Sequence, residues 1–332
     1  MWQVKTLSDK KQILAFLQQD RLYAAYAIGD LEPSLFARCQ WFGAENDGKM
    51  QALRLGSGQA LALFFTGLQP PALFTMGDTD GLAAILASAL QPERAYFTCR
   101  AEHLPVVKTF YALDEVEEMF RMAINPADFR SASGPTIKLE LSHLDALHQL
   151  YRLGGGDAFA PYQLQDGIYY GVKLNEQLVS TAGTHLVSPA FGVAAVGNIF
   201  THPNHRRRGY ATACTSQVVE ELLAQGLNVV LNVNRENAGA IGIYERLGFR
   251  RYCPFIEVLG DRKSQINGGG KNEEHHFGEP EQDPCWGTAG GASGEEGCWP
   301  PRLHLRRHHG SDLGRALSSV PGHLWPHPAP QH

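Results

Sequence analysis

A buried strand, a basic glycine turn and a long helix follow one another over residues 193–226, and this stretch constrains the fold most. The apolar run VAAVGNIFT predicts the strand, and Pro203 marks its end because proline donates no hydrogen bond to a sheet. The turn HRRRG places three consecutive arginines directly before Gly209. Apolar side chains at helical spacing predict the helix, which Gly226 closes; they are Ala211, Cys214, Val218, Val219, Leu222 and Leu223.

The arginine turn is either solvent-exposed charge or the wall of an anion site. A helix N-terminus presents unpaired N–H groups and about half a positive charge, which favours bound anions. Gly209 lets the backbone approach a ligand closely, and Ala211 keeps the first helical turn free of bulk. Arg206, Arg207 and Arg208 would steer a polyanion such as a pyrophosphate to this turn. The chain lacks the G-x-x-x-x-G-K-[ST] pattern, so this turn is not a P-loop.

Charge and composition narrow the partners and the compartment. The formal net charge is −5 over 332 residues, whereas nucleic-acid-binding domains are normally strongly basic, so no nucleic-acid partner is expected. No run approaches the ~18 apolar residues of a transmembrane helix, and residues 1–16 lack the features of a signal peptide. These patterns predict a cytoplasmic protein that does not bind a membrane. The six scattered cysteines are predicted to be free thiols.

Three regions of the chain differ in their sequence pattern. Residues 1–130 alternate helix and strand signals, with a hairpin predicted over residues 50–65. A polar linker at 125–136 leads into residues 131–262, which again alternate helices and strands. Both regions predict an α+β fold, in which helices flank a mixed central sheet. Residues 263–332, rich in Gly, Pro, His and charge, are predicted to be a disordered tail without a metal site.

Two motifs in a fixed order carry a family resemblance. The first is Arg206-x-x-Gly209-x-Ala211 in the basic turn. The second has the form Asn-x-x-Ala…Tyr-x-x-x-Gly-Phe and consists of Asn237, Ala240, Tyr244, Gly248 and Phe249. Separated by a helix and a strand, they resemble the pyrophosphate loop and the second signature of the GNAT superfamily of N-acetyltransferases. The resemblance covers about residues 137–259.

The resemblance implies acetyl-CoA as co-substrate and no metal. In that fold, the strands that contain GNIFT and LNVVLNV separate, and the pantetheine arm lies in the gap. The residues implied in binding are Ile199, Phe200, Thr201, Arg206, Arg207, Arg208, Gly209, Tyr210, Ala211, Thr212, Asn237 and Tyr244. Asn237 also suits the N-cap of the following helix, and the two roles are compatible.

The family position of Tyr244 implies a proton donor to the departing thiolate of CoA; alternatively, its ring only packs on the sheet. A phenol with a pKa of about 10 keeps its proton at neutral pH. The proton acceptor is less defined, because the strand VAAVGNIF contains no acid. His185 is the first candidate, although a lone strand histidine is often structural. His202, Glu236 and a chain of waters are the alternatives.

The acceptor pocket is expected in the stretch AFAPYQLQDGIYYG, since in related enzymes this segment faces the acyl group. Its candidate residues are Phe159, Tyr162, Gln163 and Tyr169, and the aromatic members are also candidates for the core. These features predict transfer of an acetyl group to a primary amine of a small molecule or peptide by direct attack on the thioester. The alternative is a silent acyl-CoA-binding sensor or scaffold.

Residues 1–130 lack both motifs, but their mixed layout fits a degenerate copy of the same fold. Residues 131–262 would then be the catalytic domain of a two-domain chain. The protein is expected to be a monomer or a homodimer.

Overall fold

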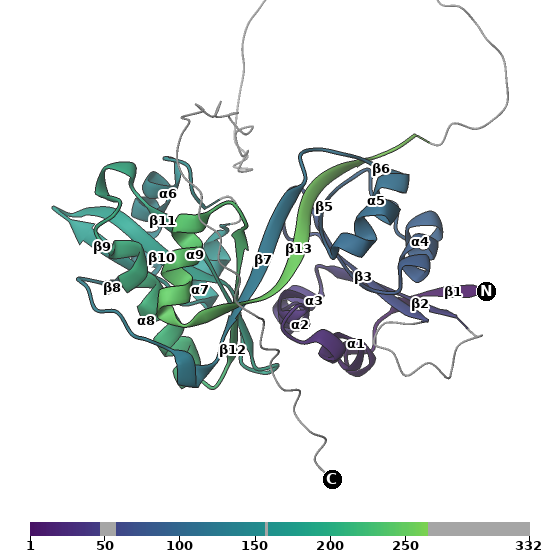
Figure 1. Cartoon of the computed structure of the whole chain (residues 1–332), viewed down its shortest axis with the longest axis horizontal. Helices are drawn as coiled ribbons and strands as arrows, with labels where there is room; N and C mark the ends of the chain where they lie inside the picture. The colour runs from purple at the N-terminus through teal and green to yellow at the C-terminus, as the bar shows by residue number, and fades with distance from the viewer. Residues whose placement is uncertain (47–57, 157–158, 265–332) are drawn as a thin grey trace, which may run out of the picture. The chain divides into compact units, whose positions relative to one another are not determined.

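The computed structural model describes residues 1–46, 58–156 and 159–264 (Figure 1). The described residues belong to one compact unit, and the predicted boundary at residue 130, which lies inside it, stays a prediction. The first strand of the hairpin predicted at 50–65 lies outside the described residues. So does the predicted tail, apart from its first two residues.

The N-terminal half, through residue 124, contains helices and strands in alternation. Its elements are β1 (Trp2–Leu7), α1 (Lys10–Leu17), α2 (Ala25–Gly29), α3 (Pro33–Phe36), β2 (Cys39–Asn46), β3 (Gln59–Phe65), β4 (Ala72–Gly77), α4 (Thr79–Ser88), β5 (Arg94–Cys99), α5 (Leu104–Phe110), β6 (Tyr111–Leu113) and β7 (Glu117–Ile124). Single 3-10 turns at Gln18–Asp20 and Ala101–His103 precede α2 and α5.

The C-terminal half, from residue 125, follows the order predicted from the sequence. Its elements are β8 (Ile137–Lys138), α6 (Leu144–Tyr151), α7 (Pro161–Asp166), β9 (Tyr170–Leu174), β10 (Gln177–Ser188), β11 (Val193–Thr201), α8 (Tyr210–Ala224), β12 (Asn228–Asn234), α9 (Ala238–Leu247) and β13 (Phe249–Arg262). The helix predicted after Gly209 is confirmed, a hairpin turn lies at Asn175, and Gly248 ends the helix α9. Helices flank one mixed sheet, so the predicted fold class is confirmed.

The two halves repeat one topology. In the first, β1, β2, β3 and β4 pair antiparallel in order, and β4 then pairs parallel with β5. In the second, β8, β9, β10 and β11 do the same, and β11 pairs parallel with β12. A helix, α4 or α8, connects the parallel strands in each half. This repeat supports the interpretation of the N-terminal half as a copy of the same fold.

The last strand of each half is exchanged with the other half. β7 comes from the N-terminal half but pairs with β12, and β13 comes from the C-terminal half but pairs with β5. β7 and β13 also pair with each other, so the order β5-β13-β7-β12 joins both halves in one sheet (Figure 1). Each half therefore completes the sheet of its neighbour.

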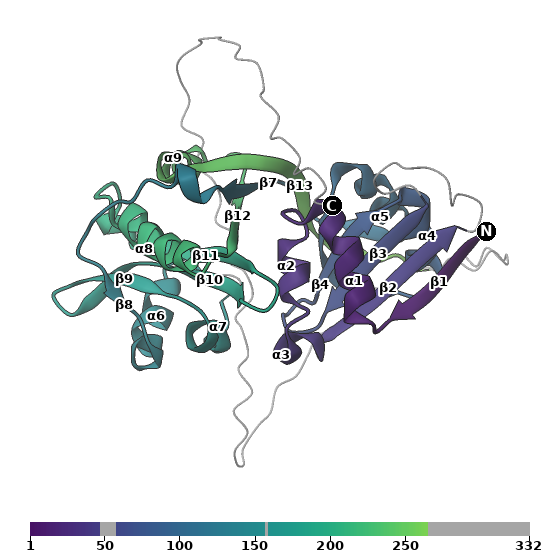
Figure 2. The ribbon, with the colours of Figure 1, turned by 90° about the horizontal axis from the view of Figure 1, so that it is seen from below.

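Apolar side chains cover both faces of the C-terminal strands. On one face α8 and α9 contribute Cys214, Val218 and Leu247 to a core with Val196 and Leu231. On the other face Ala24 and Ile28 of the N-terminal half pack with Val193, Ala195 and Val230, and α2 contacts β11 (Figure 2). Burial on both faces explains why these strands are continuous apolar runs. It also confirms the predicted packing role of Cys214, which is 0% exposed.

Candidate active site

The turn before α8 has the backbone shape of an anion site. Gly209 has a φ of 80° and is the residue before the first turn of α8, which receives no side-chain cap. Arg207 also has a positive φ, of 62°. A Cβ added at Gly209 would meet nothing within 4 Å. The first N–H groups of a 15-residue helix thus face an open approach, which suits a diphosphate.

The three arginines supply positive charge at this turn. None of the ion pairs between described residues includes Arg206, Arg207 or Arg208. Arg206 folds back on the end of β11, where its Nε donates to the carbonyl oxygen of Thr201 at 3.2 Å. Its guanidinium lies 5.8 Å from the ring centre of Phe200. The residues predicted to hold the diphosphate therefore adjoin the strand end predicted to hold the pantetheine.

β11 and β12 separate after four residue pairs. Their register runs from Val193 with Asn228 to Val196 with Leu231 and then ends. Beyond that point Phe200 and Thr201 pair only with β10, opposite Thr181 and Ser180. Tyr210, Ala211 and Thr212 lie in the first turn of α8, beside this strand end. The pairing of β11 with β12 therefore ends at the place where the resemblance predicts the gap for the pantetheine.

Asn198 of β11 has a strained backbone two residues beyond the last pair of β11 and β12. Asn198 has a φ of 52°, a left-handed conformation that few residues adopt, and is 8% exposed. Its Nδ2 donates to Gln163 Oε1 at 3.1 Å and to the hydroxyl of Tyr169 at 2.7 Å. Its carbonyl oxygen accepts from the hydroxyl of Tyr151 at 2.6 Å. Three buried side chains therefore hold this strained residue near the point where the pairing of β11 and β12 ends.

The four residues predicted for the acceptor pocket have different surroundings in the structure. Gln163 and Tyr169 hold Asn198, so they shape the strand rather than face open space. Phe159 is 3% exposed and packs on Tyr169, with ring centres 6.0 Å apart. Tyr162 is half-buried, and the guanidinium of Arg38 from the N-terminal half lies 5.5 Å from its ring. A substrate-binding role for these four residues stays a prediction.

Tyr244 and Asn237 lie on α9. Tyr244 is 7% exposed and packs on Phe249, with ring centres 6.2 Å apart. Burial raises the pKa of Tyr244 well above its ordinary value of 10, so its hydroxyl keeps its proton at neutral pH. Asn237 is the N-cap of α9, where its Oδ1 accepts from the amide of Ala240 at 3.1 Å. The predicted N-cap role of Asn237 is thus confirmed.

The three candidate bases occupy different surroundings. The ring of His185 lies over Gly197 of β11, where an added Cβ would come within 1.9 Å of its Nε2. Burial, followed by the charge of Arg121, lowers the pKa of His185 to about 4, so its imidazole is neutral at pH 7 but weakly basic. His202 caps the 3-10 turn at Pro203–His205, and Glu236 is exposed after β12. Of the three, His185 is the one whose ring lies against β11 near the end of its pairing with β12.

Sequence reasoning missed three polar residues near the gap. Arg121 of β7 is 1% exposed, and Tyr26 of α2 lies between it and His185, with ring centres of Tyr26 and His185 5.9 Å apart. Glu257 of β13 accepts from the Tyr96 hydroxyl at 3.1 Å and from Asn232 Nδ2 at 3.2 Å. Burial raises its pKa. The available signal was a lone charge in each of the apolar strands FRMAI and PFIEVLG.

Two further observations concern the described part of the chain. No group of three or more His, Cys, Asp or Glu side chains within it is arranged to hold a metal ion. None of the helices described is long and apolar enough to span a bilayer.

Comparisons of sequence agree with this site. Residues 141–249 match the model of the acetyltransferase (GNAT) family. The chain is also similar to [Ribosomal protein bS18]-alanine N-acetyltransferase of Escherichia coli K12, with 29% identity over 110 residues. That match covers 31% of this chain and 72% of the relative.

Solved structures of similar fold extend across both halves. A Drosophila protein aligns with a TM-score of 0.59 and 13% identity over 78% of this chain and 98% of its own. A GCN5-related N-acetyltransferase from Sphaerobacter thermophilus aligns with a TM-score of 0.51 and 14% identity, over 79% of this chain and 96% of its own. At these identities the comparison concerns the fold alone.

The fold, the open helix N-terminus beside a separating pair of parallel strands and the family match define an acyltransferase that acts on amines. Residues 141–249 thus resemble the acetyltransferase (GNAT) family, and the enzyme class that these comparisons support is N-acetyltransferase.

Proposed function

We propose that this protein transfers the acetyl group of acetyl-CoA to a primary amine of a small molecule or peptide, by direct attack on the thioester. The uncapped N-terminus of α8 beside the gap between β11 and β12 carries this proposal. Amides from Arg207 to Thr212 would hold the diphosphate, with the side chains of Arg206, Arg207 and Arg208 around it. The backbone of Ile199, which has no register partner on β10 or β12, and of its neighbours would hold the pantetheine.

When bound, acetyl-CoA supplies a thioester carbon, at which a C–N bond to the acceptor forms as the C–S bond breaks. Tyr244 is the proposed donor of a hydrogen bond, and then of a proton, to the departing sulfur, because burial keeps its hydroxyl protonated. His185 is the proposed acceptor of the proton that the amine loses, directly or through water. Its low pKa makes the imidazole available at neutral pH without making it a strong base.

A catalytically silent acyl-CoA-binding module is the second candidate. The absence of an acid on β11 favours it. Incubation with acetyl-CoA and a panel of amines separates the two functions, since only transfer releases free CoA thiol in proportion to acetylated amine. Binding of acetyl-CoA without amine-dependent thiol release would establish the silent module.

Replacing Tyr244 with Phe tests the proposed acid. We expect turnover to fall at least about tenfold, since general acids contribute roughly 10²–10⁴-fold, while the acetyl-CoA dissociation constant from calorimetry stays unchanged. Tyr170→Phe is the matched control, because the Tyr170 hydroxyl donates to Glu221 at 2.9 Å on the α8 side of the sheet. Equal turnover of Tyr244→Phe and wild type would remove Tyr244 from the mechanism.

A further inference from the structure

Arg121 is a buried cation whose donors lack partners among the described residues. Its Nε and Nη1 make no hydrogen bond there, and its side chain takes part in no ion pair there. The rings of Tyr26 and Phe255 lie against the guanidinium, with their centres 4.5 Å and 5.2 Å away. Burying a charge with unpaired donors is strongly unfavourable, so such an arginine requires an explanation.

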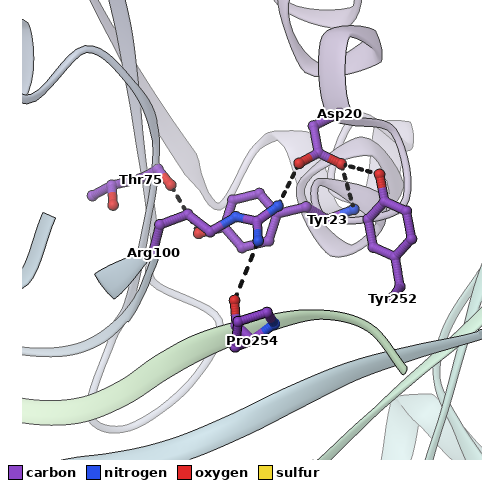
Figure 3. A network of polar contacts seen from close by, with 6 residues as sticks. All are labelled: Asp20, Tyr23, Thr75, Arg100, Tyr252 and Pro254. Carbon is purple, nitrogen blue, oxygen red and sulfur yellow. Dashed lines mark hydrogen bonds and ion pairs between the residues drawn. The ribbon is translucent and has the colours of Figure 1, made fainter. Parts of the chain in front are cut away.

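Arg100 shows how the same molecule satisfies another largely buried arginine. Its guanidinium pairs with Asp20 and donates to the carbonyl oxygen of Pro254 at 3.2 Å (Figure 3). Its charge also lies over the ring of Tyr23, 4.1 Å from the ring centre. Both arginines stack on a tyrosine, but among the described residues only Arg100 forms an ion pair. An anion would satisfy both the charge and the unpaired donors of Arg121.

Arg121 lies beside the gap between β11 and β12. Its register partner on β12 is Asn232, the first residue after the last β11–β12 pair at Leu231. Directly opposed residues of antiparallel strands have Cα atoms about 4.5–5.5 Å apart. Asn232 Oδ1 is likewise buried without a partner there. Arg121 and Asn232, two residues with unpaired buried polar groups, thus lie next to the place where the thioester of acetyl-CoA is proposed to bind.

The face of the sheet on which Arg121 lies indicates which of the two substrates could reach it. Met119 and Ala123 lie two residues from Arg121 along β7 and therefore on the same face of the sheet. Both belong to the core shared with α2. α8 and its arginine turn cover the opposite face, with Met122 and Ile124. A thioester held at α8 would meet the Arg121 side only through the gap. That side is therefore where an acceptor would approach.

We propose that the acceptor amine carries a carboxylate and that the Arg121 guanidinium binds it. This inference rests on the proposed acetyl transfer and names the substrate class of that site. Arginine suits the task because its charge persists when buried and its planar donors match carboxylate oxygens. Glu257 is the nearby carboxyl group, but its two oxygens accept from Tyr96 and Asn232 instead. It leaves the unpaired donors of Arg121 available.

The experiment compares amino acids with their amides on the full chain. Glycine, β-alanine and 4-aminobutanoate are each paired with the corresponding amide, and kcat/KM is measured with acetyl-CoA. We expect at least one acid to exceed its amide by about tenfold or more, in accord with a charge-assisted contact. Arg121→Gln should abolish this preference, Arg121→Lys should retain part of it, and Arg100→Gln should leave it intact.

A binding measurement gives a second readout that is independent of turnover. With saturating CoA, which lacks an acetyl group to transfer, the preferred acid should raise the melting temperature of wild type but not of Arg121→Gln. The corresponding amide should raise neither. If Arg121→Gln fails to fold, the wild-type comparison of acid with amide, together with Arg121→Lys, decides the proposal.

Three results would overturn it: equal kcat/KM and equal thermal shifts for acids and amides, a preference that survives in Arg121→Gln, or an Arg121-dependent preference for succinyl-CoA over acetyl-CoA with an uncharged amine. The last result would place the carboxylate on the acyl group instead. Acid binding without transfer to any amine would overturn the proposed function and leave the carboxylate site standing.

Discussion

The helices α4 and α8 hold the same place in the two halves, yet their N-termini differ. Asp78 precedes α4, and its carboxylate accepts from the amides of Asp80 at 2.9 Å and Gly81 at 3.4 Å. Gly209 precedes α8, which has no side-chain cap. The N-terminal half thus satisfies its helix with an anion of its own. The C-terminal half keeps the same backbone groups available and surrounds them with arginines.

The gaps beside these helices differ in the same way. β4 and β5 stop pairing after Phe74 and Thr98, but the chain fills the opening. Tyr23 donates to the carbonyl oxygen of Thr75 at 3.1 Å, and the ring nitrogens of His103 lie 2.8 Å from Thr75 Oγ1 and 2.9 Å from the Gly77 oxygen. In the C-terminal half, Ile199 has no register partner on β10 or β12. One copy of the fold is closed by its own side chains, and the other is open.

This difference indicates that the fold shared by the two halves does not by itself form a ligand-binding site. A parallel strand pair and a helix create a gap and a positive helix end in both halves. Whether they form a ligand site depends on a few side chains at the turn. The comparison therefore favours the C-terminal half as the place of the proposed acetyl-CoA binding, and this can be tested by exchanging those side chains.

The largest effect should come from giving α8 an acidic residue at its N-terminus, like the Asp78 that caps α4. Gly209→Asp places a carboxylate where the diphosphate is proposed to bind, and we expect the acetyl-CoA dissociation constant to rise about a hundredfold by charge repulsion. Gly209→Asn is the matched control, because it has the same backbone strain without the charge. Calorimetry measures both variants. Equal losses for Asp and Asn would assign the effect to strain and would weaken the proposed anion site.

The reciprocal change removes the cap of α4. Asp78→Ala leaves the amides of Asp80 and Gly81 unpaired, and it also removes a 3.3 Å contact from the amide of Gly58. We expect the free energy of unfolding to fall by about 1–2 kcal/mol, as for other lost N-caps. Acetyl-CoA affinity should not change. Urea titration of Asp78→Ala and of the control Asp80→Ala measures this, and a loss of affinity would show that the halves do not act separately.

The smallest effect concerns acid stability. Burial lowers the pKa of His103 in the closed half and the pKa of His185, to about 4, beside the open gap. Because the unfolded chain then binds more protons below pH 6.5, stability is lost as the pH falls from 6.5 toward 4.

We expect His185→Asn to reduce this loss by on the order of 1 kcal/mol between pH 7 and pH 5, a value discounted for the partial exposure of the side chain. Urea titrations at the two pH values measure it, with His202→Asn as control. An unchanged pH dependence in His185→Asn would mean that burial does not keep its imidazole neutral.

Local patterns predicted most of the C-terminal half. The strand, glycine turn and helix around Gly209 follow from apolar spacing and from the conformational freedom of glycine, which depend only on neighbouring residues. Gly248 ends α9 with a φ of 105°, as its position after the apolar residues indicated. The gap between β11 and β12 followed from the family resemblance rather than from these patterns.

The exchange of β7 and β13 could not be predicted in this way, because the alternation of polar and apolar residues within a strand does not determine which strands it pairs with. The same limit hid Arg121 and Glu257, since a lone charge in an apolar strand has no meaning until its neighbours are known. Gln163 and Tyr169 illustrate the converse: their types suited a pocket, but only the structure shows that both accept hydrogen bonds from the side chain of Asn198.

The exchanged strands also affect how the chain is made. β7 leaves the ribosome well before β12 and β13, the two strands that it lies between, have been synthesised. Until then the first half exposes an unsatisfied edge at β5, and β7 waits without a partner. A nascent chain that stops near residue 130 would thus be prone to pair with other chains, and translation through residue 262 is what completes both halves.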